Sequence, residues 1–331
     1  MEMTKTIKNN KYIFLIGSVF LLLFVLLLAL RLGSVEYSYS QIFKVLSSPE
    51  MTADRNIIFN VRLPRILIAT MIGANLAVAG ALLQAVMQNP LADPGLTGVS
   101  SGASLAAIII MLLFPKYTYL VPLVAFFGGA FACALVYLLA WKNGIKPIRI
   151  VLAGVAINAI LGGGTSLLST LFSDRIQGIL MWVNGSISGK TWSDVKILAI
   201  YSSIGIVVSM FFIRKANILQ LGDEMSSNLG VNTNKYRLII SLIAVFLAGI
   251  STAIVGVVGF VGLIVPHISR LIIGSDYKYM LPFSVVTGSA LLLLGDTFAR
   301  TVVRPIELPV GVIMAVIGGP FFLYLLRRGN A

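Results

Sequence analysis

The chain has 331 residues, of which 58% are hydrophobic and 11% charged, whereas about a quarter of the residues of a soluble protein are charged. This composition excludes a soluble globular protein and leaves no room for an autonomous ATPase or catalytic domain of ordinary size. The net charge of +13 comes from basic residues scattered between apolar runs, a pattern typical of loops near lipid headgroups rather than of nucleic-acid binding.

The N-terminus is polar up to Lys11 and then almost wholly apolar. We expect a retained first membrane span at about 12–32 rather than a cleaved signal peptide, because the apolar run is longer than a typical signal-peptide core. Nine further apolar segments follow, at about 61–87, 97–114, 119–141, 148–172, 194–213, 238–258, 259–273, 280–299 and 310–326.

These segments predict an all-α polytopic membrane protein with about ten transmembrane helices, both termini in the cytoplasm, and one domain over residues 1–331. Segment 259–273 is short and contains Pro266, so we expect a partial or kinked span. The mixed segment 174–193 predicts a short helix at the membrane interface.

Residues that could carry chemistry are scarce. The single cysteine, Cys133, and the single histidine, His267, cannot form a Cys/His metal cluster. Segment 184–191 approaches a phosphate-binding loop but has Asn184 where that motif needs glycine. We therefore expect no catalytic residue, no metal and no cofactor.

Charges within the predicted spans are rare; Asp296 and Arg300 have the spacing of an i,i+4 pair near a helix end. An ion-coupled transporter needs groups that bind its coupling ion near mid-membrane. The scarcity of such groups disfavours an ion-coupled secondary transporter, although that class and a non-transporting membrane scaffold remain alternatives.

Two clusters of residues are candidate contact surfaces. Arg62, Arg65, Arg300 and Arg304 fall outside the membrane in this topology, where they suit carboxylates of a soluble partner or, alternatively, lipid headgroups. The second surface is a cytoplasmic loop at about 214–237, in which residues 219–231 predict a short helix with a partly apolar face.

Seven motifs, in this order along the chain, resemble the FecCD family of permease subunits. They are RLPR at 62–65, GALLQ at 80–84, NPLADPG at 89–95, GVSSGA at 98–103, LGDE at 221–224, GLIVPHISR at 262–270 and ELPVG at 307–311. The family imports ferric siderophores, haem and vitamin B12 through the bacterial cell membrane.

The resemblance implies ten helices, a permease dimer made with a second copy or a homologous permease, two cytoplasmic ATPase subunits, and a periplasmic or lipid-anchored binding protein. It implies that Arg62, Arg65 and Arg300 meet glutamates of the binding protein. The implied ATPase contact comprises Leu221, Gly222, Asp223, Glu224, Met225, Leu229 and Gly230.

The implied gate departs from the vitamin B12 permeases of the family, which have small hydroxyl residues where this chain has Pro147 and Ile148. Asn158, Ser166 and Thr170 on the following span are candidates to face the translocation path. The expected function is an ATP-driven importer permease for a ferric siderophore, with haem and cobalamin as alternatives.

Overall fold

The computed structural model describes residues 2–47, 52–142 and 144–327, which are almost entirely helical. Ten apolar helices run through this part of the chain. They are α1 (Glu2–Arg31), α4 (Leu63–Met87), α5 (Val99–Leu113), α6 (Val121–Ala140), α7 (Pro147–Leu171), α9 (Trp192–Phe211), α12 (Thr233–Val255), α13 (Val261–Ile273), α14 (Tyr277–Ala299) and α15 (Val310–Arg327).

Shorter helices join these ten. They are α2 (Tyr39–Ser47), α3 (Ala53–Arg55), the π-helix η1 (Asn56–Arg62), the 3₁₀ helices η2 (Pro94–Thr97) and η3 (Pro115–Leu120), α8 (Gln177–Val183), α10 (Ile213–Leu219) and α11 (Asp223–Asn228).

The ten apolar helices agree with the predicted number of about ten spans. Seven are long and apolar enough to cross a membrane, and α5, α13 and α15 supply shorter apolar segments. Helix α13 has 13 residues, or about 20 Å of rise, which is less than the roughly 30 Å of a bilayer's hydrocarbon core. The predicted short helix between the fifth and sixth spans is α8.

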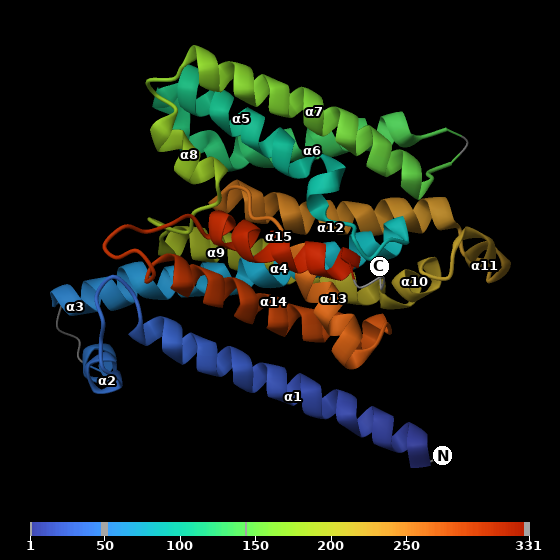
Figure 1. Cartoon of the computed structure of the whole chain (residues 1–331), viewed down its shortest axis with the longest axis horizontal. Coiled ribbons are helices and arrows are strands. Elements are labelled where there is room, and N and C mark those ends of the chain that lie inside the picture. The colour runs from blue at the N-terminus through green and yellow to red at the C-terminus, as the bar shows by residue number, and fades with distance from the viewer. Residues whose placement is uncertain (1, 48–51, 143, 328–331) are drawn as a thin grey trace.

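The helices lie side by side in layers (Figure 1). Helices α5, α6 and α7 form one layer, α4, α9 and α12 lie in the middle, and α14 and α1 lie on the far side. The N-terminal end of α1, α11 and the end of α15 share one end of the molecule, whereas α2 and α3 lie at the other. This arrangement agrees with both termini facing the cytoplasm; we call the α11 end the inner end.

Helix α4 is the centre of the fold because its small residues admit close neighbours. In its most apolar window 83% of residues are buried, against 17% for both α1 and α7. A Cβ added at Gly73 would lie 2.2 Å from the carbonyl oxygen of Gly288 on α14, and one at Gly80 would lie 1.9 Å from that of Gly262 on α13. Only glycine permits these approaches.

Candidate functional site

Five charged side chains meet at the outer end of the molecule; we call Arg62, Arg65, Asp296, Arg300 and Glu307 the outer cluster. Arg65 on α4 donates from Nε and Nη2 to the Asp296 carboxylate at 2.9–3.1 Å, and from Nη1 to Glu307 at 2.6 Å. The Nε of Arg300 lies 3.9 Å from Asp296, so the i,i+4 pair expected from the sequence is present.

Arg62 and Arg300 also connect the outer cluster to α1 and the loop that follows. Arg62 donates to the carbonyl oxygens of Leu30 at 2.5 Å and Val35 at 2.7 Å. Arg300 donates to that of Ala29 at 2.6 Å. The outer cluster therefore fastens α1, α4 and α14 together.

The three arginines expected to meet a binding protein are 4%, 6% and 3% exposed (Arg62, Arg65 and Arg300). Docking through them stays a prediction, and it would require these side chains to exchange internal partners for external carboxylates. Arg304 and Glu36, paired at 2.6 Å, are more accessible at the same end, with side-chain exposures of 33% and 55%.

Within the outer cluster, the neighbours of Glu307 favour the charged form of its carboxylate. Burial raises the pKa of Glu307, but the charge and hydrogen bond of Arg65 outweigh burial and hold that pKa below its ordinary value. Glu307 also accepts a hydrogen bond from the Ser34 hydroxyl at 3.2 Å.

At the inner end, α11 presents an apolar face to its surroundings. Leu221, Met225 and Leu229 are 55%, 55% and 57% exposed. Met225 and Leu229 are four residues apart and lie on one side of α11, and Leu221 lies just before the helix. The opposite side is fixed to the protein, because the buried hydroxyl of Ser226 donates to the carbonyl oxygen of Ile218 at 2.8 Å.

Glycines bound α11 because the backbone is left-handed there: φ is +94° at Gly222 and +71° at Gly230. The two carboxylates of the first turn differ in environment. Asp223 pairs with Arg237 at 2.6 Å, whereas Glu224 is exposed and makes no ion pair among the described residues.

The candidate path residues do not all share one environment. On α7 the side chains of Ser166 and Thr170 are exposed, one turn apart. The side-chain amide of Asn158 instead donates to the carbonyl oxygen of Gly95 in η2 at 2.9 Å, so it is directed toward this chain's own helices. At the inner end of α7, Pro147 is partly buried and Ile148 is 62% exposed.

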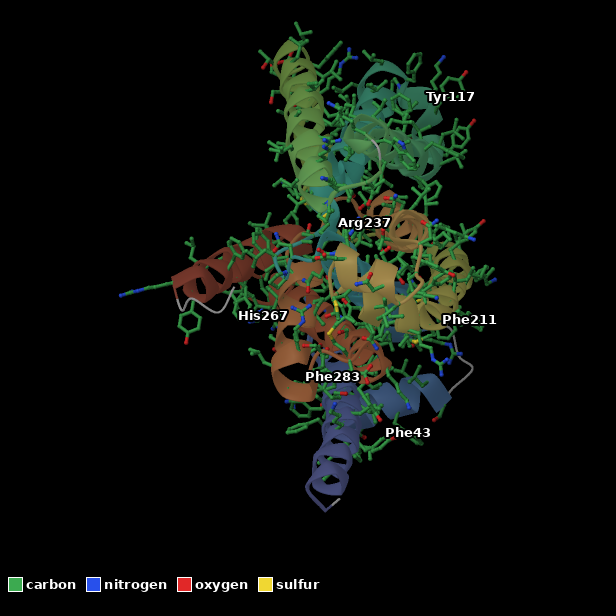
Figure 2. All side chains as sticks on the ribbon, turned by 90° about the vertical axis from the view of Figure 1, so that its right-hand side faces the viewer. Phe43, Tyr117, Phe211, Arg237, His267 and Phe283 are labelled. Atoms are coloured by element: carbon green, nitrogen blue, oxygen red, sulfur yellow. The ribbon has the colours of Figure 1, made fainter. Side chains whose placement is uncertain are left out.

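Arg237 is a site residue that the sequence analysis missed. Figure 2, viewed from the inner end, shows it near the middle of the molecule, and its side chain is 0% exposed. In the sequence it looks like one more basic residue before an apolar run. The available signal is its position five residues into a helix whose following residues are nearly all apolar.

Comparisons with known proteins bear on this geometry. The model of the FecCD transport family matches residues 21–328. The chain is 40% identical to the Fe(3+)-citrate import system permease protein YfmD of Bacillus subtilis, covering 97% of this chain and 96% of that protein. It is 37% identical to the probable heme-iron transport system permease protein IsdF of Staphylococcus aureus, covering 98% of both.

A solved structure has the same fold. It is an inward-facing conformation of a metal-chelate type ABC transporter, which superposes with a TM-score of 0.83 at 28% sequence identity and covers 95% of this chain and 98% of that one.

Proposed function

The chain belongs to the FecCD transport family and is a multi-pass permease subunit of an ATP-binding-cassette importer in a bacterial cell membrane; on that premise we propose that its cargo is a ferric chelate of the siderophore type. ATP hydrolysis belongs to separate subunits in such transporters. The support for this cargo is the iron(III)-citrate permease, which is 40% identical along nearly the whole chain. Haem is the second candidate, because a probable haem-iron permease is 37% identical over a similar length.

The proposed assembly has two permeases, two ATPases and one binding protein. Residues 1–331 act as a single permease domain, paired with a second copy or a homologous permease. The exposed faces of α7 support this pairing, because only Ile150, Gly154 and Ile157 of that helix are buried in the single chain. Ser166 and Thr170 then face the translocation path, with Pro147 and Ile148 at its inner end.

The observation that carries the transport mechanism is the exposed apolar face formed by Leu221, Met225 and Leu229. Three large apolar side chains on a short cytoplasmic element suit a pocket on another protein. In the proposed cycle the ATPase holds this face, and ATP binding displaces α11.

Uptake measurements test the cargo. Cells lacking the gene are expected to lose uptake of one ⁵⁵Fe-labelled chelate from a panel of ferric citrate, ferric siderophores and haem, with labelled cobalamin as a further substrate. Loss of haem uptake alone would favour the second candidate. Unchanged uptake of all iron compounds with loss of cobalamin uptake would contradict the ferric cargo.

A triple variant tests the ATPase contact. Leu221→Glu, Met225→Glu and Leu229→Glu together are expected to prevent co-purification of the ATPase, because three carboxylates would enter an apolar pocket. The matched control is Ser227→Glu, which introduces a carboxylate at an exposed position of the same helix outside that face. Co-purification of the ATPase with the triple variant at the wild-type ratio would contradict the contact.

We also propose that the binding protein docks on Arg62, Arg65 and Arg300, and a test of this docking needs a variant that leaves no new buried charge. Arg300→Met replaces a buried guanidinium by an apolar side chain of similar length and is expected to weaken binding-protein affinity at least tenfold. Arg304→Gln, at an accessible position of the same end, is the control. If only the control variant loses affinity, docking uses the accessible basic residue and not the outer cluster.

A further inference from the structure

The guanidinium of Arg237 joins three separate segments at the inner end. Its Nε donates to the carbonyl oxygen of Val86 on α4 at 3.0 Å, and its Nη1 to that of Ile145, just before α7, at 2.6 Å. Its Nη2 donates to Asp223 on α11 at 2.6 Å. A single side chain at the start of α12 thus contacts α4, α7's leading segment and α11.

The carboxylate of Asp223 is the one acidic partner of Arg237 among the described residues. Arg237 is fully buried, whereas the Asp223 side chain is 48% exposed. Removing the carboxylate would leave a buried cation without a counter-charge, which is strongly unfavourable. Helix α11 is therefore held to the membrane helices by an interaction that resists separation.

Gln88 forms a second connection beside this pair. It ends α4 in a left-handed conformation, with φ of +49°. Its amide donates to Asp223 at 3.1 Å and to the carbonyl oxygen of Leu219 at 3.1 Å. The end of α4 is therefore bonded to the same carboxylate that Arg237 binds.

The segment before α7 is held to α12 through both backbone groups of Ile145, its N–H and its carbonyl oxygen. Ile145 donates its N–H to the side-chain oxygen of Asn234 at 2.9 Å, and its carbonyl oxygen accepts from Arg237. Asn234 and Arg237 both belong to the first turns of α12. Helix α7 begins two residues after Ile145, at Pro147.

We propose that the ion pair between Asp223 and Arg237 is the mechanical link that carries displacement of α11 to the inner end of α7. Arg237 is a positioning residue: it moves Ile145, and through it the start of α7, with α11. This inference rests on the proposed ATPase contact of α11. It assigns the transmission of that movement to one buried side chain and one carboxylate.

Coupling between ATP hydrolysis and transport tests the link in the reconstituted transporter with its ATPase and binding protein. Asp223→Asn is expected to retain assembly and ATP hydrolysis while the amount of chelate moved per ATP falls at least tenfold. Asp174→Asn, the same change at an exposed carboxylate outside both contact surfaces, is expected to keep the wild-type ratio. A wild-type ratio in Asp223→Asn would overturn the proposal.

A double variant separates coupling from stability. Asp223→Asn with Arg237→Met removes the buried cation together with its partner, so the fold is relieved of an unpaired charge. It is expected to unfold at a temperature near that of the wild type and to remain uncoupled. Normal chelate transport per ATP in this variant would overturn the link.

A distance measurement tests the link without requiring transport. Spin labels at Ser227→Cys and Ile148→Cys, both exposed positions, report the separation of α11 from the start of α7, and the native Cys133 is buried. A narrow distance distribution that broadens on adding Asp223→Asn supports the link, and an unchanged distribution overturns it. If the wild-type complex shows no chelate-dependent transport, the proposed function fails instead, whatever the distances show.

Discussion

Arg65 and Asp296 form an enclosed ion pair of the outer cluster, with side-chain exposures of 7% and 1%. Three of the Arg65–carboxylate contacts involve Asp296 and a fourth reaches Glu307. Because both partners are shielded from water, the pair adds little net stability to the fold. Removing one partner alone is nevertheless strongly destabilising, since it leaves the other charge buried and unpaired.

Replacement of that aspartate should therefore be costly. Asp296→Asn is expected to lower the free energy of unfolding by about 3–5 kcal/mol, since it leaves Arg65 and Arg300 buried with less counter-charge. Thermal unfolding of the detergent-solubilised protein measures this. Glu36→Gln, which removes the exposed partner of Arg304, is the control and should leave the melting temperature nearly unchanged; equal melting temperatures for the two variants would contradict the argument.

The pKa of Glu307 gives a pH dependence with a definite sign. Because Arg65 holds that pKa below its ordinary value of 4.5 in the folded chain, the stabilisation is fully present above pH 4.5 and is lost as the pH falls through the depressed pKa. The melting-temperature difference between wild type and Glu307→Gln should thus be constant from about pH 8 to pH 5 and shrink below about pH 4.5. A difference that grows on acidification would refute this assignment.

At the scale of elements, the contacts of α4 with α13 and α14 depend on glycine. The carbonyl of Gly262 occupies the space that a side chain at position 80 would need, and backbone atoms cannot move aside as a flexible side chain can. Small residues allow such approaches between membrane helices, where packing rather than water expulsion drives association.

Adding a methyl group at Gly80 tests its close contact with Gly262, and adding one at Gly17, where there is open space, is the control. Gly80→Ala should force α4 away from α13 and reduce the yield of monodisperse protein in fluorescence-detected size-exclusion chromatography by at least half. Gly17→Ala on α1 meets no atom within 4 Å and should behave as wild type. Normal yield from Gly80→Ala would show that the two helices lie further apart.

At the scale of the whole molecule, the single chain leaves much of α7 uncovered. Gly162, Ser166 and Thr170 are all exposed and recur every four residues along it. Small and hydroxyl-bearing residues on one face favour contact with another helix or with a polar path over contact with lipid. The proposed permease pair places this face at its interface.

Cross-linking decides between the two kinds of pair. Gly163 is exposed, and a Cβ added there would meet no atom within 4 Å; the native Cys133 is buried. Gly163→Cys is expected to form an oxidised dimer in native membranes if the partner is a second copy. An exclusively monomeric band, with Gly163→Cys still active in uptake, would indicate a homologous partner instead.

The sequence by itself determined the membrane-spanning class, the ten apolar helices and the short α8, because the bilayer imposes a length and a polarity that a single segment must satisfy alone. It also indicated the Asp296–Arg300 pair, since both residues lie on one helix. Only the tertiary structure decided that Arg65 pairs with Asp296 and Glu307 and that Arg237 pairs with Asp223. The burial of these arginines depends on contacts between residues distant in the chain, and a basic residue that ends up buried looks the same in sequence as one that faces water or headgroups.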